Sequence, residues 1–172
     1  EENANVLTVD YETSDSRVNY GQVIQAAIVA TDNNLNIKKK YDLRCRLKPN
    51  VIPSIGACMV HKIPVNILKN SNKSHYQMVM EHYDIIKQYT PSIIMGFNSV
   101  SFDLEFYRRM LFKSLIPDVY QTNTKGNKHL DILNVSRAAK FTNVDSIKTI
   151  MSEKNRPSFK LSDLSTANDI NN

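Results

Sequence analysis

The stretch that most constrains this chain is an apolar run ending in two carboxylates, VLTVDYET from Val6 to Thr13. Its β-branched residues are typical of a buried strand. Side chains alternate along a strand, so Asp10 and Glu12 should share one side at its carboxyl end and repel unless a cation lies between them. The pair is therefore a candidate metal site, although a solvated pair is the simpler explanation of this common tripeptide taken alone.

Length and composition bound what can surround this strand. A chain of 172 residues suits one domain, spanning residues 1–172, that buries about two thirds of its unfolded surface. Its 41% hydrophobic and 23% charged residues are ordinary for a soluble globular protein, and no apolar run reaches membrane-spanning length. The net charge of +5 favours a polyanionic partner.

The cysteines and the start of the chain bear on where the protein works. Cys45 and Cys58 have neither the spacing of a zinc site nor the density of a disulfide framework. Two reduced thiols in a cytoplasmic protein are expected, and no secretory segment is visible. The chain begins at Glu1 without a Met, so we expect an excerpted sequence.

The pattern after the first strand predicts a mixed sheet. A second strand over Val23 to Thr31, turn residues, and a half-exposed third strand over Leu35 to Leu47 form an antiparallel meander. A helix capped by Ser74 follows the meander. Its apolar stripe consists of Tyr76, Val79, Met80, Tyr83 and Ile86. The apolar run from Ser92 to Phe97 then predicts a fourth strand, which a right-handed crossover makes parallel to the first.

The remaining segments are predicted as short helices and loops. The expected elements are an irregular link over 55–63, a helix over 64–68, a mobile loop over 121–128, a helix over 131–141, a basic loop over 152–157 and a last helix from 159 to 172. The link contains His61, and Asp131 stands where an acid caps a helix.

Asp103 is a third candidate acid. It falls in the first turn of a helix predicted over Leu104 to Leu115, directly after the strand that runs parallel to the one carrying Asp10. Sites in α/β sheets form at the carboxyl ends of parallel strands, so Asp103 should reach the Asp10 and Glu12 pair. An acid that complements the helix dipole is an equally good explanation of its position.

Three motifs in order give the chain a recognisable pattern. They are DYET at residues 10–13, GFN-x-V-x-FD at 96–103 and PSFKLS-x-L-x-x-AN at 157–168. Together they resemble the bacterial exonuclease I family, within the DEDD group of 3′→5′ exonucleases, over nearly the whole chain. The resemblance implies an α/β fold of the ribonuclease-H-like type, with three antiparallel strands, then parallel strands, and flanking helices.

The resemblance also implies an activity. Members of the family remove mononucleotides from the 3′ end of single-stranded DNA, in DNA repair, with two Mg²⁺ ions for which Mn²⁺ can substitute. Asp10, Glu12 and Asp103 match three of the four metal-binding acids of the family. Hard cations take carboxylate oxygens, and phosphodiester hydrolysis consists largely of positioning and charge neutralisation, so such acids on strand ends suit the reaction.

Five further residues match family positions near the substrate. Thr13 and His61 would lie beside the terminal nucleotide, or are an ordinary strand-end Thr and a surface His. This chain reads Val-His-Lys-Ile where related exonucleases often have Val-His-Gly-Ile. Phe102 would stack on a base, or is a core residue. Asn98 would bond either the backbone or the substrate. Lys160 would contact a phosphate where the family carries Arg.

One part of the family pattern is absent from these 172 residues. The fourth acid and the general-base histidine belong to an H-x-A-x-x-D motif that would follow the AN match, and no such sequence occurs here. Asp131 matches only a supporting acid, and His129 lacks the context of the motif. We therefore expect an exonuclease domain truncated before its last catalytic helix, with little or no activity alone.

Two rival interpretations remain open. An RNA-directed 3′→5′ exonuclease of the oligoribonuclease kind would share the metal chemistry and differ in recognition of the 2′-OH. A catalytically silent module that binds nucleic acid or protein is the second rival. In the family, further domains close around the strand and bind the single-strand-binding protein, so that partner would be reached through domains outside this sequence.

Overall fold

The computed structural model describes residues 5–170. The chain divides into two compact units, Glu1–Leu130 and Asp131–Asn172, and each is described by itself. The single exonuclease domain expected from the sequence stays a prediction. None of the helices in the described part of the chain is long and apolar enough to cross a membrane.

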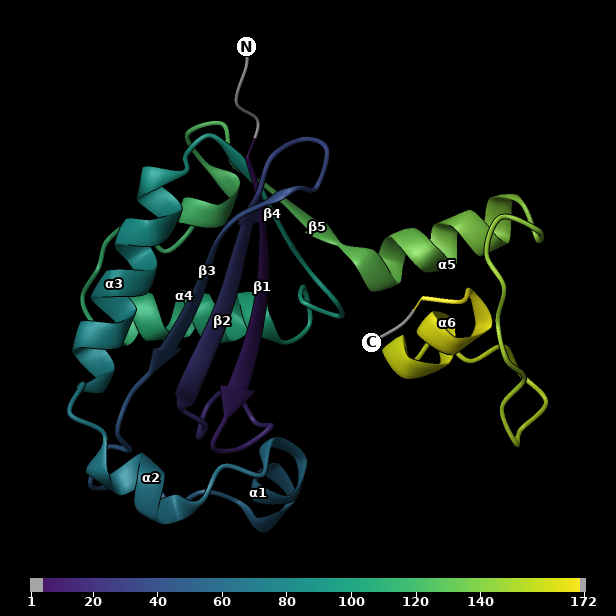
Figure 1. The fold of residues 1–172 in the computed structure, drawn as a ribbon. Coiled ribbons are helices and arrows are strands. Elements are labelled where there is room, and N and C mark those ends of the chain that lie inside the picture. Colours follow the sequence, from purple (N-terminus) through teal and green to yellow (C-terminus); the bar gives the residue numbers. More distant parts are fainter. Residues whose placement is uncertain (1–4, 171–172) are drawn as a thin grey trace. The chain divides into compact units, whose positions relative to one another are not determined.

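A mixed sheet forms the centre of the first unit (Figure 1). Its strands are β1 (Asn5–Thr13), β2 (Val23–Thr31), β3 (Ile37–Arg44), β4 (Ser92–Gly96) and β5 (Lys128–Asp131), in the order β3-β2-β1-β4-β5. β1 to β3 pair antiparallel, and β4 runs parallel to β1 with Leu7 opposite Ile94. The predicted α/β, ribonuclease-H-like sheet is therefore confirmed.

Seven helical segments accompany the sheet in the described residues. They are α1 (Ile55–His61), α2 (Val65–Asn70), α3 (His75–Gln88), α4 (Asp103–Lys113), the 3-10 turn η1 (Gln121–Asn123), α5 (Ile132–Thr142) and α6 (Leu161–Ala167). Ser74 begins α3 with a capping box, in which its hydroxyl accepts from the backbone of Gln77 and the Gln77 side chain accepts in return. Figure 1 shows α1 and α2 at the end of the sheet toward which β1 runs.

Two predicted segments were wrong. The link over 55–63 is helix α1, in which the Ser54 hydroxyl accepts from the backbone N–H of Ala57. This helix buries none of its side chains, so it lacks the apolar periodicity by which helices are recognised. The loop predicted over 121–128 holds η1 and the start of β5, and Gln121 and Thr122 are buried there.

Three details of the predicted helices also differ. Tyr76, predicted on the apolar stripe of α3, is 54% exposed, while His75 and His82 are buried on the inner face instead. Leu115 follows the end of α4 at a φ of 55° and is exposed. The last helix, predicted to reach Asn172, ends at Ala167; residues 171–172 lie outside the described residues.

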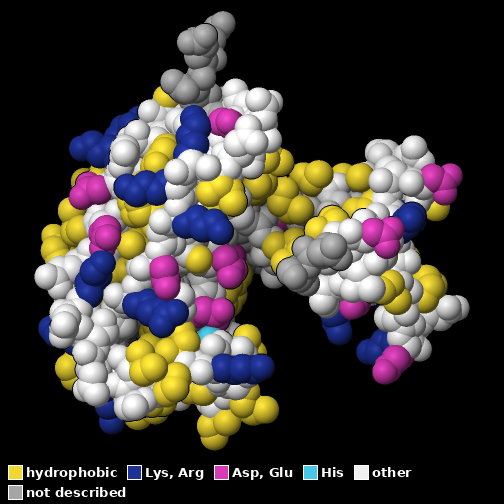
Figure 2. Space-filling view, viewed as in Figure 1, with side chains coloured by type: hydrophobic (Ala, Val, Ile, Leu, Met, Phe, Trp, Pro, Cys, Tyr) yellow, Lys and Arg dark blue, Asp and Glu magenta, His cyan; other side chains and the backbone are white. Residues whose placement is uncertain are grey.

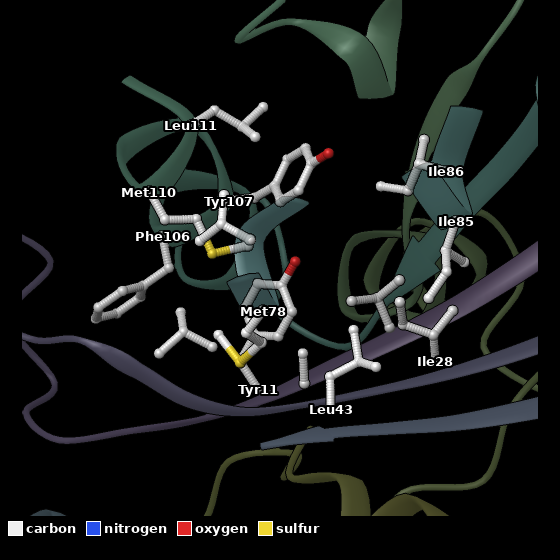
Figure 3. Packing of buried hydrophobic residues seen from close by; sticks show 14 of the residues in the cluster. Tyr11, Ile28, Leu43, Met78, Ile85, Ile86, Phe106, Tyr107, Met110 and Leu111 are labelled. Atoms are coloured by element: carbon white, nitrogen blue, oxygen red, sulfur yellow. The ribbon is translucent and has the colours of Figure 1, made fainter. Parts of the chain in front are cut away.

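The core lies between the sheet and helices α3 and α4 (Figure 3). Tyr11, Ile28 and Leu43 of the strands face the apolar side chains of these helices. The helical members shown are Met78, Ile85, Ile86, Phe106, Tyr107, Met110 and Leu111. Each such side chain contributes about 1.5–3 kcal/mol when fully buried.

Two polar side chains within the core, Tyr11 and His82, contact each other. The Tyr11 hydroxyl lies 2.7 Å from His82 Nε2, and the His82 ring packs on Tyr107 with centroids 4.7 Å apart. At the edge of the core the Cys45 thiol donates to the Val23 carbonyl, and burial raises its pKa to about 11. Cys58, on α1, is half-buried, and both cysteines are free thiols.

Candidate active site

The alternation of β1 separates its core residues from its acids. Leu7, Val9 and Tyr11 are buried, so Asp10 and Glu12 project from the opposite face of the strand. Burial raises the pKa of Asp10, partly offset by a hydrogen bond from the Tyr11 backbone. Burial and then the negative charge of Asp10 raise the pKa of Glu12. The two carboxylates are close enough to repel, which is the donor arrangement that a divalent cation relieves.

Asp103 begins α4 and is 6% exposed. Its charge contributes to the raised pKa of Tyr11, and both residues line one small interior cavity. The parallel pairing of β4 with β1 therefore places Asp103 beside the buried face of β1, on the side of Tyr11, and its reach to the Asp10 and Glu12 pair stays a prediction. Among the described residues, no three His, Cys, Asp or Glu side chains come close enough together to hold a metal ion. The Asp10 and Glu12 pair is thus the part of the predicted ligand set that fits a cation as it stands.

A tight turn from β4 into α4 positions the neighbouring residues. A Cβ on Gly96 would lie 2.7 Å from the Ser99 Cβ, so only Gly allows Ser99 to fold back over the strand end. Ser99 Oγ lies 3.0 Å from Nε2 of His129. Asn98 adopts a φ of 57° and is exposed, which suits a residue type that tolerates the left-handed region. Its place in this turn accounts for Asn98 without a ligand.

A cavity of about 230 Å³ lies at the carboxyl end of β1. Four of the predicted site residues line it, namely Glu12, Thr13, His61 and Phe102. Its other walls are Tyr11, Ser16, Ser54, Gly56, Ala57 and Val60, mostly from the start of α1. In Figure 2 acidic side chains gather over the lower part of the sheet, next to a His side chain. The structure therefore brings residues 12, 13, 61 and 102 together from three separate elements.

The polar groups of this cavity have defined roles. The Thr13 hydroxyl donates to the Asp15 carbonyl at 3.0 Å, which leaves its oxygen free to accept. Nδ1 of His61 accepts from the Ile63 backbone N–H at 2.9 Å, and burial lowers the pKa of the ring. A neutral His61 then carries its proton on Nε2, a buried atom with no hydrogen-bond partner in the described part of the chain. The cavity thus offers one acceptor and one donor beside a carboxylate.

Phe102 closes the opposite side of the cavity. Its ring packs on Phe106 at a centroid distance of 4.9 Å and is partly buried against the core. Phe102 therefore contacts the core and also lines the cavity, and its stacking on a base stays a prediction.

Lys62 replaces the family Gly at a demanding position. It ends α1 in the left-handed region with a φ of 54°, and its N–H donates to the Cys58 carbonyl. Gly is the usual residue at such a helix end because it has no Cβ. Lys62 adopts this conformation at a cost in strain that a Gly at the same position would not carry.

Two predicted residues belong to the second unit. Lys160 precedes the first turn of α6 and is exposed. The Asp131 carboxylate caps α5 by accepting from the Leu133 N–H at 3.0 Å. Asp131 therefore has the capping role that was one of its two explanations.

The α1 wall was missed by sequence reasoning. Ser54, Gly56, Ala57 and Val60 lie in a segment predicted to be irregular. A signal was available, because Ser54 follows a Pro and stands three residues before the N–H that it caps.

Comparisons with known proteins also indicate an exonuclease domain. Residues 2–163 match the model of the exonuclease domain of DNA polymerase family B. Exodeoxyribonuclease I of Buchnera aphidicola subsp. Acyrthosiphon pisum is 31% identical over 169 residues, which cover 96% of this chain and 40% of that protein.

Solved structures agree on the fold. E. coli exonuclease I in complex with a dT13 oligonucleotide superimposes with a TM-score of 0.90 at 24% identity, covering 98% of this chain and 36% of that one. An exonuclease I structure with SSB-Ct gives 0.92 at 23% identity, covering 98% and 37%. The chain thus spans 40% or less of the length of these proteins. By the match over residues 2–163, the chain belongs to the family of DNA polymerase family B exonuclease domains.

Proposed function

We propose that this chain is the nuclease part of a 3′→5′ exonuclease that releases mononucleotides from single-stranded DNA. The observation that carries the proposal is the cavity at the end of β1, which joins a carboxylate of a mutually repelling acid pair to an acceptor, a donor and an aromatic ring. Membership of an exonuclease family implies the use of a divalent metal.

Asp10 and Glu12 would hold that metal, with Asp103 as the third acid. Bound Mg²⁺ or Mn²⁺, two ions in the full reaction, would activate water and stabilise the departing 3′ oxygen. The acids would hold the metal at the strand end, where the scissile phosphate would bind to it. Burial and then the charge of Asp10 raise the pKa of Glu12, and a bound cation would stabilise both carboxylates in their charged form.

The other cavity residues would bind the terminal nucleotide. Thr13 Oγ1 accepts from the 3′-OH, since its own proton is held by the Asp15 carbonyl. His61 Nε2 donates to a sugar or phosphate oxygen. Phe102 presents a ring to the base or sugar. Asn98 would contact the strand. Lys160, in the second unit, would contact a phosphate.

Partners follow from the same proposal. Structures of exonuclease I hold an oligonucleotide in one case and SSB-Ct in another. We propose single-stranded DNA as the substrate, in cytoplasmic DNA repair, and the single-strand-binding protein as a partner of regions outside these 172 residues. The residues here include no H-x-A-x-x-D sequence, so we expect slow cleavage or none from this chain alone.

The test follows metal binding and cleavage separately. Mn²⁺ and Mg²⁺ are titrated calorimetrically into the 172-residue chain, and release of mononucleotides from 3′-labelled DNA and RNA of one sequence is followed for this chain and for the longer protein that carries it. We expect metal binding in both, and cleavage of DNA in the longer protein. Loss of binding in Asp10→Asn, with Asp84→Asn on the exposed side of α3 unchanged, would localise the metal.

Other outcomes of this test would support one of the two alternative functions. Faster cleavage of RNA would establish the oligoribonuclease kind of enzyme. Binding of DNA without metal binding or cleavage in either protein would establish a silent binding module.

A further inference from the structure

A second cavity in the first unit differs from the candidate active site in its chemistry. It has a volume of about 450 Å³ and is formed by the loop before β2, the segment after β3, the start of α3 and the second half of α4. Its lining residues are Val18, Asn19, Tyr20, Gly21, Gln22, Val23, Lys48, Asn50, Val51, His75, Phe106, Arg109, Met110 and Lys113. None of them lines the cavity at the end of β1.

The charged residues of this lining are all basic. Lys48, Arg109 and Lys113 face the cavity together with His75, and the lining includes neither Asp nor Glu. Within residues 5–170, none of the three cations forms an ion pair. We call these four residues the basic cluster.

The members of the basic cluster interact with one another. Burial, and then the charges of Lys48 and Arg109, lower the pKa of Lys113. Burial, and then Lys48 and Lys113, lower the pKa of His75 to about 4. Like charges held this close without a counter-charge are destabilising, and a bound anion would remove the repulsion.

Hydrogen-bond donors are also available. His75 is 7% exposed and lines the cavity. Lys113 Nζ uses one of its donors on the Asn19 carbonyl at 3.4 Å, which holds the ammonium at the cavity wall. The wall is closely built, because a Cβ on Gly21 would lie 2.5 Å from the Asp15 carbonyl oxygen and 2.9 Å from the Phe106 ring.

We propose that this cavity binds a small phosphate-bearing anion, of the size of inorganic phosphate or a mononucleotide. A guanidinium and two ammonium groups around one space are the donors that phosphate oxygens take. The volume lies within the range of about 300–1,000 Å³ of small-molecule sites. The proposal does not depend on the nuclease activity, although a mononucleotide is also what that activity would release.

The test uses binding alone. Inorganic phosphate and dTMP are titrated into ¹⁵N-labelled chain at low and high salt. We expect saturable shifts of the backbone signals of residues 19–22, 48–51 and 109–113. Lys113→Met and Arg109→Met should each weaken binding about tenfold or more, while Lys87→Met, a matched change on the exposed face of α3, should leave it unchanged.

The two titrations distinguish a nucleotide from free phosphate as the ligand. Tighter binding of dTMP than of phosphate would support a nucleotide site, and equal binding would support a site for free phosphate. Failure of either anion to saturate, or equal binding in wild type and Lys113→Met, would overturn the proposal. So would an oligonucleotide that displaces dTMP far more strongly than its phosphate concentration explains. Thermal melting of Lys113→Met checks folding, and removal of a repelling charge should not lower the Tm.

Discussion

The two cavities of the first unit are electrostatic opposites built by the same physics. At the end of β1, burial and then Asp10 raise the pKa of Glu12. In the other cavity, burial and then Lys48 and Arg109 lower the pKa of Lys113. In each case burial and a neighbour of like charge favour the neutral form, so each cavity is incomplete without a counter-charge. The comparison teaches that the charge of a ligand can be inferred from side chains of like charge that lie close together without a counter-charge.

The largest expected effect separates the two cavities by function. Asp10→Asn should lower nuclease activity of the active protein by more than about 100-fold, because even residues behind metal ligands cost about 10–100-fold. Lys113→Met should change activity less than about twofold, since Lys113 lines only the second cavity. Rates of mononucleotide release under identical metal concentrations measure both. A large loss of activity in Lys113→Met would mean that both cavities bind the substrate, and would contradict the separate functions proposed for them.

The next effect concerns pH and stability. The folded-state pKa is about 4 for His75 and about 3 for His82, below the unfolded value near 6.5. Between these values the unfolded chain binds more protons, so stability is fully present above pH 6.5 and is lost as the pH falls. Each residue should cost about 1.4 kcal/mol per pH unit in that window.

Urea unfolding between pH 7 and pH 5 measures this loss. His75→Gln should flatten the dependence by about half, and the acid pair works in the opposite direction, because the pKa of Asp10 and of Glu12 is raised and their protonation favours the folded state. Stability that stays constant over this range would contradict the neutral state of both histidines.

A smaller effect tests how the core holds the acid-bearing strand. Tyr11→Phe removes the hydroxyl that lies 2.7 Å from His82 Nε2 and leaves a buried ring nitrogen unpaired. We expect a loss of about 1–3 kcal/mol in the free energy of unfolding. Chemical denaturation gives the value, with Tyr76→Phe on the exposed face of α3 as the control. An equal loss of stability in both variants would mean that the contact between Tyr11 and His82 does not stabilise the fold.

The smallest effect concerns the α1 wall. Lys62→Gly should stabilise the protein by about 0.5–1 kcal/mol, because the left-handed conformation at φ 54° carries no Cβ strain in Gly. Lys62→Ala keeps a Cβ and should change little. The Tm values of the three proteins decide the matter, and a lower Tm for the Gly variant would mean that the Lys side chain itself is needed.

How much could be predicted from the sequence differs between the two cavities. The shared face of Asp10 and Glu12 could be predicted because two residues on one strand obey a period of two, and the place of Asp103 after β4 because a crossover makes β4 parallel to β1. The fold of the sheet followed from the same local patterns. The cavity around His61 was only half anticipated, since α1 has no buried face to give a periodic signal.

The basic cluster had no signal in the sequence. Its members stand at positions 48, 75, 109 and 113, on three separate stretches of chain, and only tertiary packing brings them together. Each looks alone like an ordinary surface cation or a capped helix start. β5 was missed for a related reason, because four residues of mixed polarity become a strand only when a neighbour pairs with them.

The two thiols differ in their accessibility to thiol reagents, so each can report a different change in the protein. Cys45, with a pKa near 11 and no solvent access, should resist thiol reagents until the protein unfolds, whereas Cys58 sits half-buried on the helix that walls the cavity at the end of β1. A fluorophore could therefore be placed on Cys58 without any substitution. Its emission would report occupancy of that cavity, and late labelling of Cys45 would time the opening of the core.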